Sequence, residues 1–198
     1  MDDYFSVLGL PRRLEQDGED LQRRFYALSR RHHPDFHQTA DAGAQARALE
    51  QSALVNRAYR ALREPLTRLE HAMALEAGRD ATTAPAAKPR APRALLLEML
   101  EVQEALEEAR DGGMDEGARR RLADELERLT RRRADEETTI LARFAEWDRA
   151  GEAGSGRGPL LEWFGQALAA RAYLRTVIDD LDQALGGGHR AHAAHRGD

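Results

Sequence analysis

The sequence contains no cysteine, and this absence removes several classes of chemistry at once. Disulfide frameworks, thiolate zinc sites, cysteine-ligated iron–sulfur clusters and cysteine nucleophiles all require the missing thiol. An apolar run long enough to cross a bilayer is also missing. The opening residues, MDDYFSVLGL, have neither the pattern of a signal peptide nor the acid-poor composition of a transit peptide. We therefore expect a cytoplasmic protein with no membrane partner and no cofactor.

A strong excess of one charge is lacking as well. Charged residues make up 33% of the 198 residues, and the formal net charge at pH 7 is only −5. A surface that binds nucleic acid or anionic lipid needs a basic excess, so any recognition by charge must be local. The hydrophobic content of 41% permits a real core in one or two domains.

Segments that alternate apolar and polar residues are absent, β-branched residues are sparse, and Ala, Leu, Arg and Glu dominate. This pattern predicts an all-α fold. In residues 1–77 the apolar residues recur at helical spacing with breaks at Pro34 and Pro65, which predicts a first domain of about four helices. Residues 78–92, GRDATTAPAAKPRAP, carry closely spaced prolines and little apolar surface, so they predict a linker.

Residues 93–186 predict a three-helix bundle of antiparallel neighbours. Its helical stretches are Arg93–Arg110, Asp115–Trp147 and Pro159–Leu185. Residues 131–139, RRRADEETT, have Ala134 as their single apolar residue, so a bend or a frayed helix is expected there. The glycine-rich residues 187–198 predict a flexible tail.

The most specific motif is His33-Pro34-Asp35, which lies between an arginine-rich amphipathic helix and a polar loop. Proline fixes its own φ and favours an extended residue before it, so two polar side chains are expected on a rigid turn. Such preorganisation suits a recognition loop rather than a catalyst, because it lowers the entropy lost on docking. The simpler alternative is an ordinary surface turn.

The helix before this tripeptide carries a basic stripe. At about 100° per residue, Leu21, Phe25 and Leu28 share one face of the helix. The arginines that lie opposite or beside that face are Arg23, Arg24, Arg30 and Arg31. Guanidinium groups pair bidentately with carboxylates and lose hydration more readily than ammonium groups, so the stripe suits an acidic partner. A merely solvated helix face would give the same pattern.

The first domain resembles the J domain of DnaJ-like co-chaperones. The segments that carry the resemblance are DYFSVLGL, RRFYALSRRHHPD and SALVNRAYRALREPLTRLEH, within residues 1–77. Two positions depart from the usual pattern, because His32 stands where tyrosine is common and Phe36 where lysine is common. The resemblance implies that the tripeptide and the basic stripe dock on a DnaK-class chaperone and stimulate its ATP hydrolysis.

The second domain adds a more specific resemblance. No Gly/Phe-rich segment follows the first domain and a cysteine-rich module is impossible, which excludes the general DnaJ architecture. The segment RALLLEMLEVQEALEEA, placed after an N-terminal J domain and a linker, resembles the HscB family of iron–sulfur co-chaperones. That family delivers the scaffold protein IscU to the chaperone HscA. The resemblance implies a scaffold-binding face made of Leu96, Leu97, Leu100 and Tyr173.

Helical periodicity supports such a face independently. One apolar stripe of the first bundle helix is complete with Leu95, Met99, Val102, Leu106 and Ala109. Leu96, Leu97 and Leu100 fall outside this stripe, and exposed apolar clusters usually mark a partner surface. In the last helix the predicted core side is Phe164, Leu168, Arg171, Leu174, Val177, Ile178 and Leu181, and Tyr173 is expected to point away from its centre. The alternative is that the surplus leucines pack beneath the first domain.

Other candidate chemistry is weak. His189, His192 and His195 could gather a metal, but a glycine-rich tail supplies no fixed geometry, so we expect a solvated tail and no metal site. No glycine-rich phosphate loop and no paired nucleophile and base are visible, so no enzyme activity is expected. Two alternatives remain: a J protein for another client, and a helical nucleic-acid binder that uses Arg119–Arg121 and Arg131–Arg133. Acidic neighbours of those arginines argue against nucleic acid as a partner.

Overall fold

The computed structural model describes residues 2–33, 35, 41–78, 92–153 and 156–186. All regular secondary structure within these residues is helical, which confirms the all-α prediction. The chain divides into two units, which we call the N-terminal unit and the bundle unit. The N-terminal unit comprises Met1–Ala86 and Arg143–Gly158, and the bundle unit comprises Ala87–Ala142 and Pro159–Asp198. Most of the expected linker (79–91) and the expected tail (187–198) lie outside the described residues.

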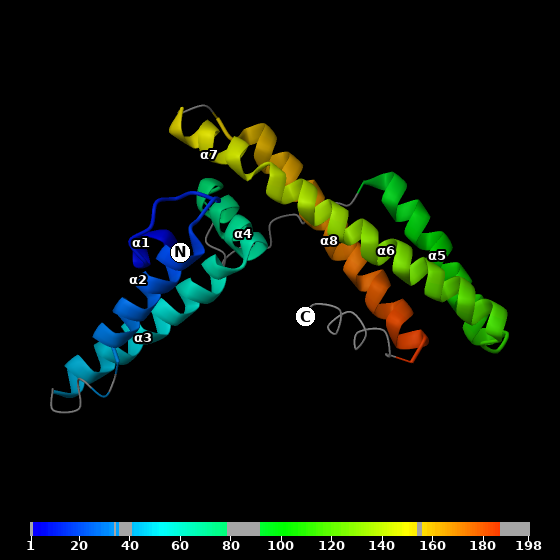
Figure 1. The fold of residues 1–198 in the computed structure, drawn as a ribbon, viewed down its shortest axis with the longest axis horizontal. Helices are drawn as coiled ribbons and strands as arrows, with labels where there is room; N and C mark the ends of the chain where they lie inside the picture. Colours follow the sequence, from blue (N-terminus) through cyan, green and yellow to red (C-terminus); the bar gives the residue numbers. More distant parts are fainter. Residues whose placement is uncertain (1, 34, 36–40, 79–91, 154–155, 187–198) are drawn as a thin grey trace. The chain divides into compact units, whose positions relative to one another are not determined.

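The N-terminal unit is built around two long helices, α2 and α3, that lie side by side (Figure 1). Its helices are α1 (Tyr4–Val7), α2 (Gly18–Arg31), α3 (Ala42–Arg63), α4 (Pro65–Glu76) and α7 (Phe144–Glu152). The Asp17 side chain caps α2 by accepting the N–H of Glu19 at 2.9 Å. Pro65 opens α4, because its fixed φ suits a first helical position. Both helix starts therefore follow from local features of the sequence.

The apolar face of α2 turns toward α3. Leu21 is buried, and the ring of Phe25 stacks on Tyr59 of α3 with 4.0 Å between ring centroids. Stacked aromatic pairs of this kind add to the stability gained from burial alone. Because this face packs inward, the opposite face of α2 is left for the arginines.

The helix α7 joins the N-terminal unit although it follows most of the bundle in sequence. The carboxylate of Asp148, only 2% exposed, accepts the backbone N–H groups of Leu14 at 2.7 Å and Glu15 at 2.9 Å. Arg157 pairs with Glu76 of α4 at 2.8 Å. These contacts fasten residues 143–158 to the N-terminal unit through buried or partly buried polar groups.

The expectation of one bundle helix from Asp115 to Trp147 is wrong. The helix α6 spans Glu116–Ala142, and α7 begins at Phe144 after a non-helical Arg143. The physical reason lies in tertiary contacts, because Phe144 and Trp147 are buried and belong to the N-terminal unit. The segment that the sequence placed wholly within the bundle therefore serves two units.

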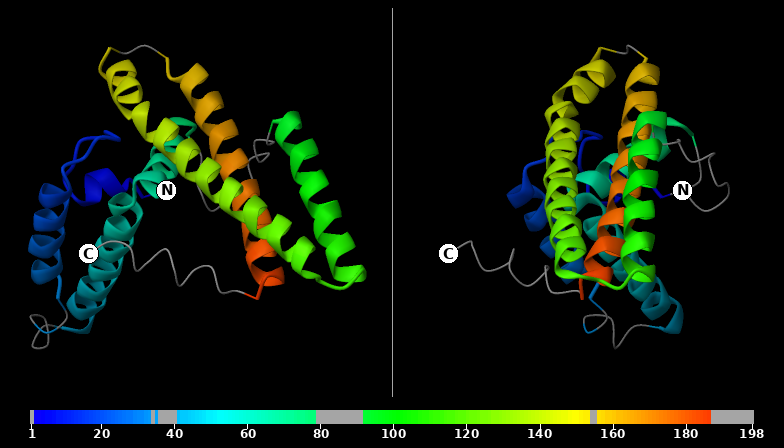
Figure 2. Two further views of the ribbon diagram at one scale, coloured as in Figure 1. Left: turned by 45° about the vertical axis from the view of Figure 1, so that its right-hand side comes forward. Right: turned by 90° about the vertical axis from the view of Figure 1, so that its right-hand side faces the viewer.

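The bundle unit contains three long helices that lie side by side in both views of Figure 2. They are α5 (Arg93–Asp111), α6 (Glu116–Ala142) and α8 (Gly158–Ala184). The connection between α5 and α6 turns at Gly113, whose φ of 79° is readily adopted only by glycine. One core cluster draws on all three helices, and it includes the whole predicted stripe of α5: Leu95, Met99, Val102, Leu106 and Ala109. The predicted stripe is confirmed.

The expected bend at residues 131–139 does not occur, because α6 runs through them without interruption. Ion pairs replace the missing apolar contacts. Arg131 pairs with Glu127 at 2.6 Å within α6, and Arg132 pairs with Glu98 of α5 at 2.5 Å. No helix in the described part of the chain is long and apolar enough to span a membrane.

Candidate functional site

The basic stripe on α2 divides into arginines with different local partners. Arg23 pairs with Asp20 at 2.9 Å and its side chain is 64% exposed. Arg24 pairs with the same carboxylate at 2.7 Å and also donates to the carbonyl of Gly9 at 2.5 Å. Hydrogen bonds from Arg24 and then Arg23 lower the pKa of Asp20. Arg24 is therefore partly committed to holding the loop before α2, whereas Arg23 is more available to a partner.

The other two predicted arginines, Arg30 and Arg31, are exposed in the last turn of α2, next to the tripeptide. Cations at this position interact favourably with the carboxyl end of the helix. Tyr26, which the sequence analysis did not single out, is also 60% exposed and accepts from Gln22 Nε2 at 3.3 Å. The sequence does indicate that Tyr26 is exposed, because an aromatic residue three positions after Arg23 falls on the polar side of the helical wheel.

The tripeptide brings two exposed polar side chains together. The backbone N–H of Asp35 donates to His33 Nδ1 at 3.3 Å. The same ring nitrogen, His33 Nδ1, lies 3.5 Å from Asp35 Oδ2. If the ring is neutral and Nδ1 accepts this hydrogen bond, the ring proton is on Nε2. The Nε2–H group can then donate a hydrogen bond to a different partner. Pro34 lies outside the described residues. The pair thus presents a carboxylate and an imidazole within a single short turn at the end of α2.

The surplus leucines of α5 are exposed. Leu96, Leu97 and Leu100 are 38%, 55% and 49% exposed, whereas Leu95 is 3% exposed and Met99 is fully buried. Adjacent residues of one helix are therefore split between a complete core stripe and an uncovered apolar side. Single exposed leucines are common on protein surfaces, but three on neighbouring turns of one helix form a patch.

Tyr173 of α8 lies at the margin of the core, consistent with the expectation that it points away from the centre of the core side. It is partly buried and packs against the bundle core. Its ring is large enough to cover core atoms and still leave part of its surface exposed. The leucine patch and Tyr173 thus lie on different helices that pack on the same core.

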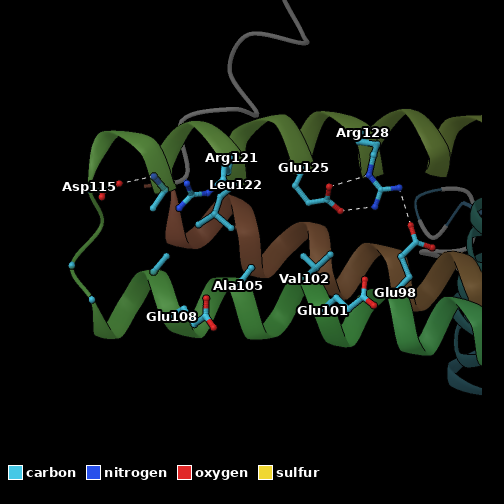
Figure 3. A pocket seen from close by; sticks show the side chains of 14 residues that line it. Glu98, Glu101, Val102, Ala105, Glu108, Asp115, Arg121, Leu122, Glu125 and Arg128 are labelled. Carbon is cyan, nitrogen blue, oxygen red and sulfur yellow. Dashed lines mark hydrogen bonds and ion pairs between the residues drawn. The ribbon is translucent and has the colours of Figure 1, made fainter.

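A groove of about 680 Å³ lies between α5 and α6 (Figure 3). Val102, Ala105 and Leu122 give it an apolar floor, and charged side chains form its walls. One wall carries Glu98, which accepts from Arg128 at 2.8 Å. Hydrogen bonds from Arg132 and then Arg128 lower the pKa of Glu98, although partial burial acts against this.

The pKa of Arg128 is raised, mainly through its hydrogen bonds to Glu125 and Glu98. Both partners are therefore held in their charged forms. Among the described residues, no group of three or more His, Asp or Glu side chains is placed to hold a metal ion. His189, His192 and His195, for which we expect no metal site, lie outside the described residues. The surface features just described suit the docking of proteins.

Comparison with known proteins agrees with this geometry. The family model of the DnaJ domain matches residues 3–71. The structure of the chaperone HscB from Vibrio cholerae is 27% identical, with a TM-score of 0.52, over 91% of this chain and 99% of that one. The chain therefore carries a DnaJ domain in residues 3–71, and it is similar to HscB over nearly its whole length. The crystal structure of the human co-chaperone protein HscB agrees in fold, with 23% identity, a TM-score of 0.60 and coverage of 92% and 82%.

The J domain of this chain includes α2 and the tripeptide, because both lie within the matched residues. The helix α7 lies outside the matched residues yet packs in the same unit, which sequence reasoning missed. The only local signal was an aspartate after an aromatic pair in FAEWD. The partners of that aspartate come from the opposite end of the chain, so no local pattern could identify them.

Proposed function

We propose that this J-domain protein is an HscB-type co-chaperone, which recruits an iron–sulfur scaffold protein of the IscU class to a DnaK-class chaperone of the HscA type and stimulates its ATPase. Iron–sulfur cluster assembly and transfer would be the process it serves. The observation that carries the proposal is the exposed patch of Leu96, Leu97 and Leu100 beside a complete core stripe. A helix that only stabilised the bundle would not need these leucines on its outer side.

The chaperone would dock on the J domain through the end of α2. Arg23, Arg30 and Arg31 leave a cationic surface beside the imidazole of His33 and the carboxylate of Asp35. An acidic chaperone surface would be attracted over several ångströms, and such charges act mainly on the association rate. After docking, the side chains of His33 and Asp35 would make the specific contacts with the chaperone. The hydrogen bond from the Asp35 N–H to His33 Nδ1 holds these two residues together.

The scaffold would dock on the leucine patch, and Tyr173 of α8 would add a partly buried aromatic contact. Interfaces are usually organised around a few apolar or aromatic anchors surrounded by polar residues. Here Glu101 and Glu104, both exposed, follow the leucines on α5. An apolar center with a charged border suits a protein client better than a small molecule.

The two proposed docking surfaces lie on different units, so each can be removed separately. The test is an ATPase assay of the purified chaperone with and without the scaffold. The variant L96A/L97A/L100A should keep the stimulation seen with the J-domain protein alone and lose the further stimulation that depends on the scaffold. Glu127→Gln, on the exposed side of α6, is the matched control and should behave as wild type.

Two outcomes would contradict parts of the proposal. Loss of all stimulation in the leucine variant would show that the patch is not specific to the client. Full scaffold-dependent stimulation would favour a J protein that serves another client. In either case, the purified protein is expected to contain no iron–sulfur cluster of its own, because thiolates are the usual ligands and the sequence has none.

A further inference from the structure

Ion pairs join α6 to both helices that carry the proposed client face. Glu98 of α5 accepts from Arg128 at 2.8 Å and from Arg132 at 2.5 Å, and the first of these contacts is drawn in Figure 3. Glu137 of α6 accepts from Arg171 of α8 at 2.7 Å. We call these five residues the polar clamp.

Each end of the polar clamp lies next to residues of the proposed client face. Glu98 lies between Leu97 and Leu100 on α5, and Arg171 precedes Tyr173 by two positions on α8. A small rotation or slide of either helix would therefore move the contact side chains. Both ends of the clamp are attached to α6. Arg132 and Glu137 lie in the polar stretch of residues 131–139, and Arg128 lies one turn before Arg132.

The start of α5 has few other constraints. Its N-cap is Pro92, which makes no side-chain hydrogen bond to the first turn. Between Arg93 and Leu100 only Leu95 and Met99 are buried. Helix ends without caps open readily, so two buried side chains alone would leave the first turns of α5 prone to local motion.

We propose that the polar clamp is a positioning device for client binding: it holds the first turns of α5 and the middle of α8 so that Leu96, Leu97, Leu100 and Tyr173 present one preformed face. The inference rests on the proposed function and adds residues to it that do not contact the client. The clamp acts by reducing the motion that the client would otherwise have to arrest on docking.

If the clamp served only to stabilise the fold, its loss would lower the melting temperature. The clamp side chains are partly exposed, at 30% for Glu98 and 49% for Arg128, and such ion pairs contribute little to global stability. Their loss should therefore leave the melting temperature nearly unchanged. Client affinity, by contrast, depends on how well the contact side chains are held before docking.

The first experiment compares Glu98→Gln with Glu127→Gln. Glu127 pairs with Arg131 at 2.6 Å entirely within α6, so its removal deletes an ion pair without loosening α5. By isothermal titration with the purified scaffold, Glu98→Gln should bind threefold to tenfold more weakly, whereas the control should match wild type. Equal affinity of Glu98→Gln and wild type, or a large fall in its melting temperature, would overturn the clamp.

A second readout is independent of any client. Amide hydrogen exchange in residues 95–100 of the free protein should be several-fold faster in Glu98→Gln than in Glu127→Gln or wild type. Unchanged exchange would overturn the positioning role. Exchange in Glu98→Gln could rise as expected while L96A/L97A/L100A binds the scaffold like wild type. That result would reject the proposed client face, and with it the proposed function.

The α8 end offers a rescue test. Glu137→Arg alone places two cations together and should weaken scaffold binding, whereas Glu137→Arg with Arg171→Glu restores the opposite charges and should recover most of the affinity. Recovery supports a role for the pair itself. A swap that binds as weakly as the single variant would overturn the role of this end of the clamp.

Discussion

Asp148 of α7 accepts the backbone N–H of Leu14 at 2.7 Å, across 134 positions of sequence. Its second oxygen accepts the N–H of Glu15 at 2.9 Å, so one buried carboxylate satisfies two amides of the loop before α2. Unsatisfied buried amides cost free energy, and an ionised acceptor makes stronger hydrogen bonds than a neutral one. The pair therefore makes α7 a structural part of the unit that contains the J domain.

This relationship predicts the effect of Asp148→Asn. The amide keeps one acceptor oxygen but turns an NH2 group toward the other N–H, so the variant should lose about 1–3 kcal/mol of unfolding free energy. Urea denaturation followed by circular dichroism measures the loss. Glu146→Gln on the same helix is the control, because Glu146 is exposed and forms its ion pair with nearby Arg143, and it should change stability by less than about 0.5 kcal/mol. Equal stability of both variants would contradict the role of Asp148.

A buried histidine predicts a dependence of stability on pH. His71 Nε2 accepts the N–H of Tyr4 at 3.1 Å, the two rings stack, and burial lowers the pKa of His71. Asp3 acts against this shift and Arg12 adds to it. A folded pKa below the unfolded value of about 6.5 means that the unfolded chain binds more protons, so this contribution is complete above that pH and is lost as pH falls.

The test is the urea midpoint between pH 7.5 and pH 5.5, a range set by the unfolded pKa of about 6.5. Wild type should lose stability toward the acid end. His71→Gln keeps an acceptor for the Tyr4 N–H but cannot titrate, so its midpoint should vary less over the same range. A steeper decline in His71→Gln than in wild type would show that other groups control the acid sensitivity.

Local patterns predicted the parts of this structure that depend on local physics. The stripe that begins at Leu95 follows from helical periodicity alone, and so do the exposed positions of Leu96 and Leu97. The break at Arg143 could not be predicted, because the helical pattern continues through it and only the contacts of Trp147 and Asp148 with distant residues make it necessary.

Contacts between helices also explain why the bend expected at residues 131–139 is absent. Residues 131–139 lack apolar side chains, yet Arg132 and Glu137 find partners on α5 and α8 that a single-helix pattern does not contain. The contacts of these two residues therefore come from other helices. Tyr173 lies off the centre of the wheel, as expected, and its ring is long enough to cover part of the core.

The tripeptide predicts a loss of function without a loss of structure. Asp35→Asn or His33→Gln should abolish stimulation of the DnaK-class chaperone, because each removes one of the two exposed groups that face each other at the end of α2. Neither side chain is buried, so the melting temperature should hardly move. Glu19→Gln, in the first turn of the same helix, is the control. Full stimulation by both tripeptide variants would contradict the proposed docking surface.

The arginines predict a difference in association kinetics. Arg23→Gln with Arg30→Gln should slow association with the chaperone and flatten its salt dependence, because exposed charges act mainly on the on-rate. Arg24→Gln should affect the rate less and stability more, since Arg24 holds the carbonyl of Gly9 and the carboxylate of Asp20. Stopped-flow association at several salt concentrations separates these effects. An unchanged salt slope in the double variant would mean that the stripe is only solvated.

The leucine patch predicts that binding and stability respond to different residues of one helix. The variant L96A/L97A/L100A removes three exposed anchors. Its scaffold affinity should therefore fall by well over tenfold, or more than about 1.4 kcal/mol, while its melting temperature stays nearly constant. Leu95→Ala is the matched control, because it empties a core position and should cost about 2–5 kcal/mol of stability. Tyr173→Ala should fall between these limits, since its ring packs on the core. A triple variant that melts far below wild type would make the three leucines structural, and one that binds the scaffold at full strength would remove them from the client face.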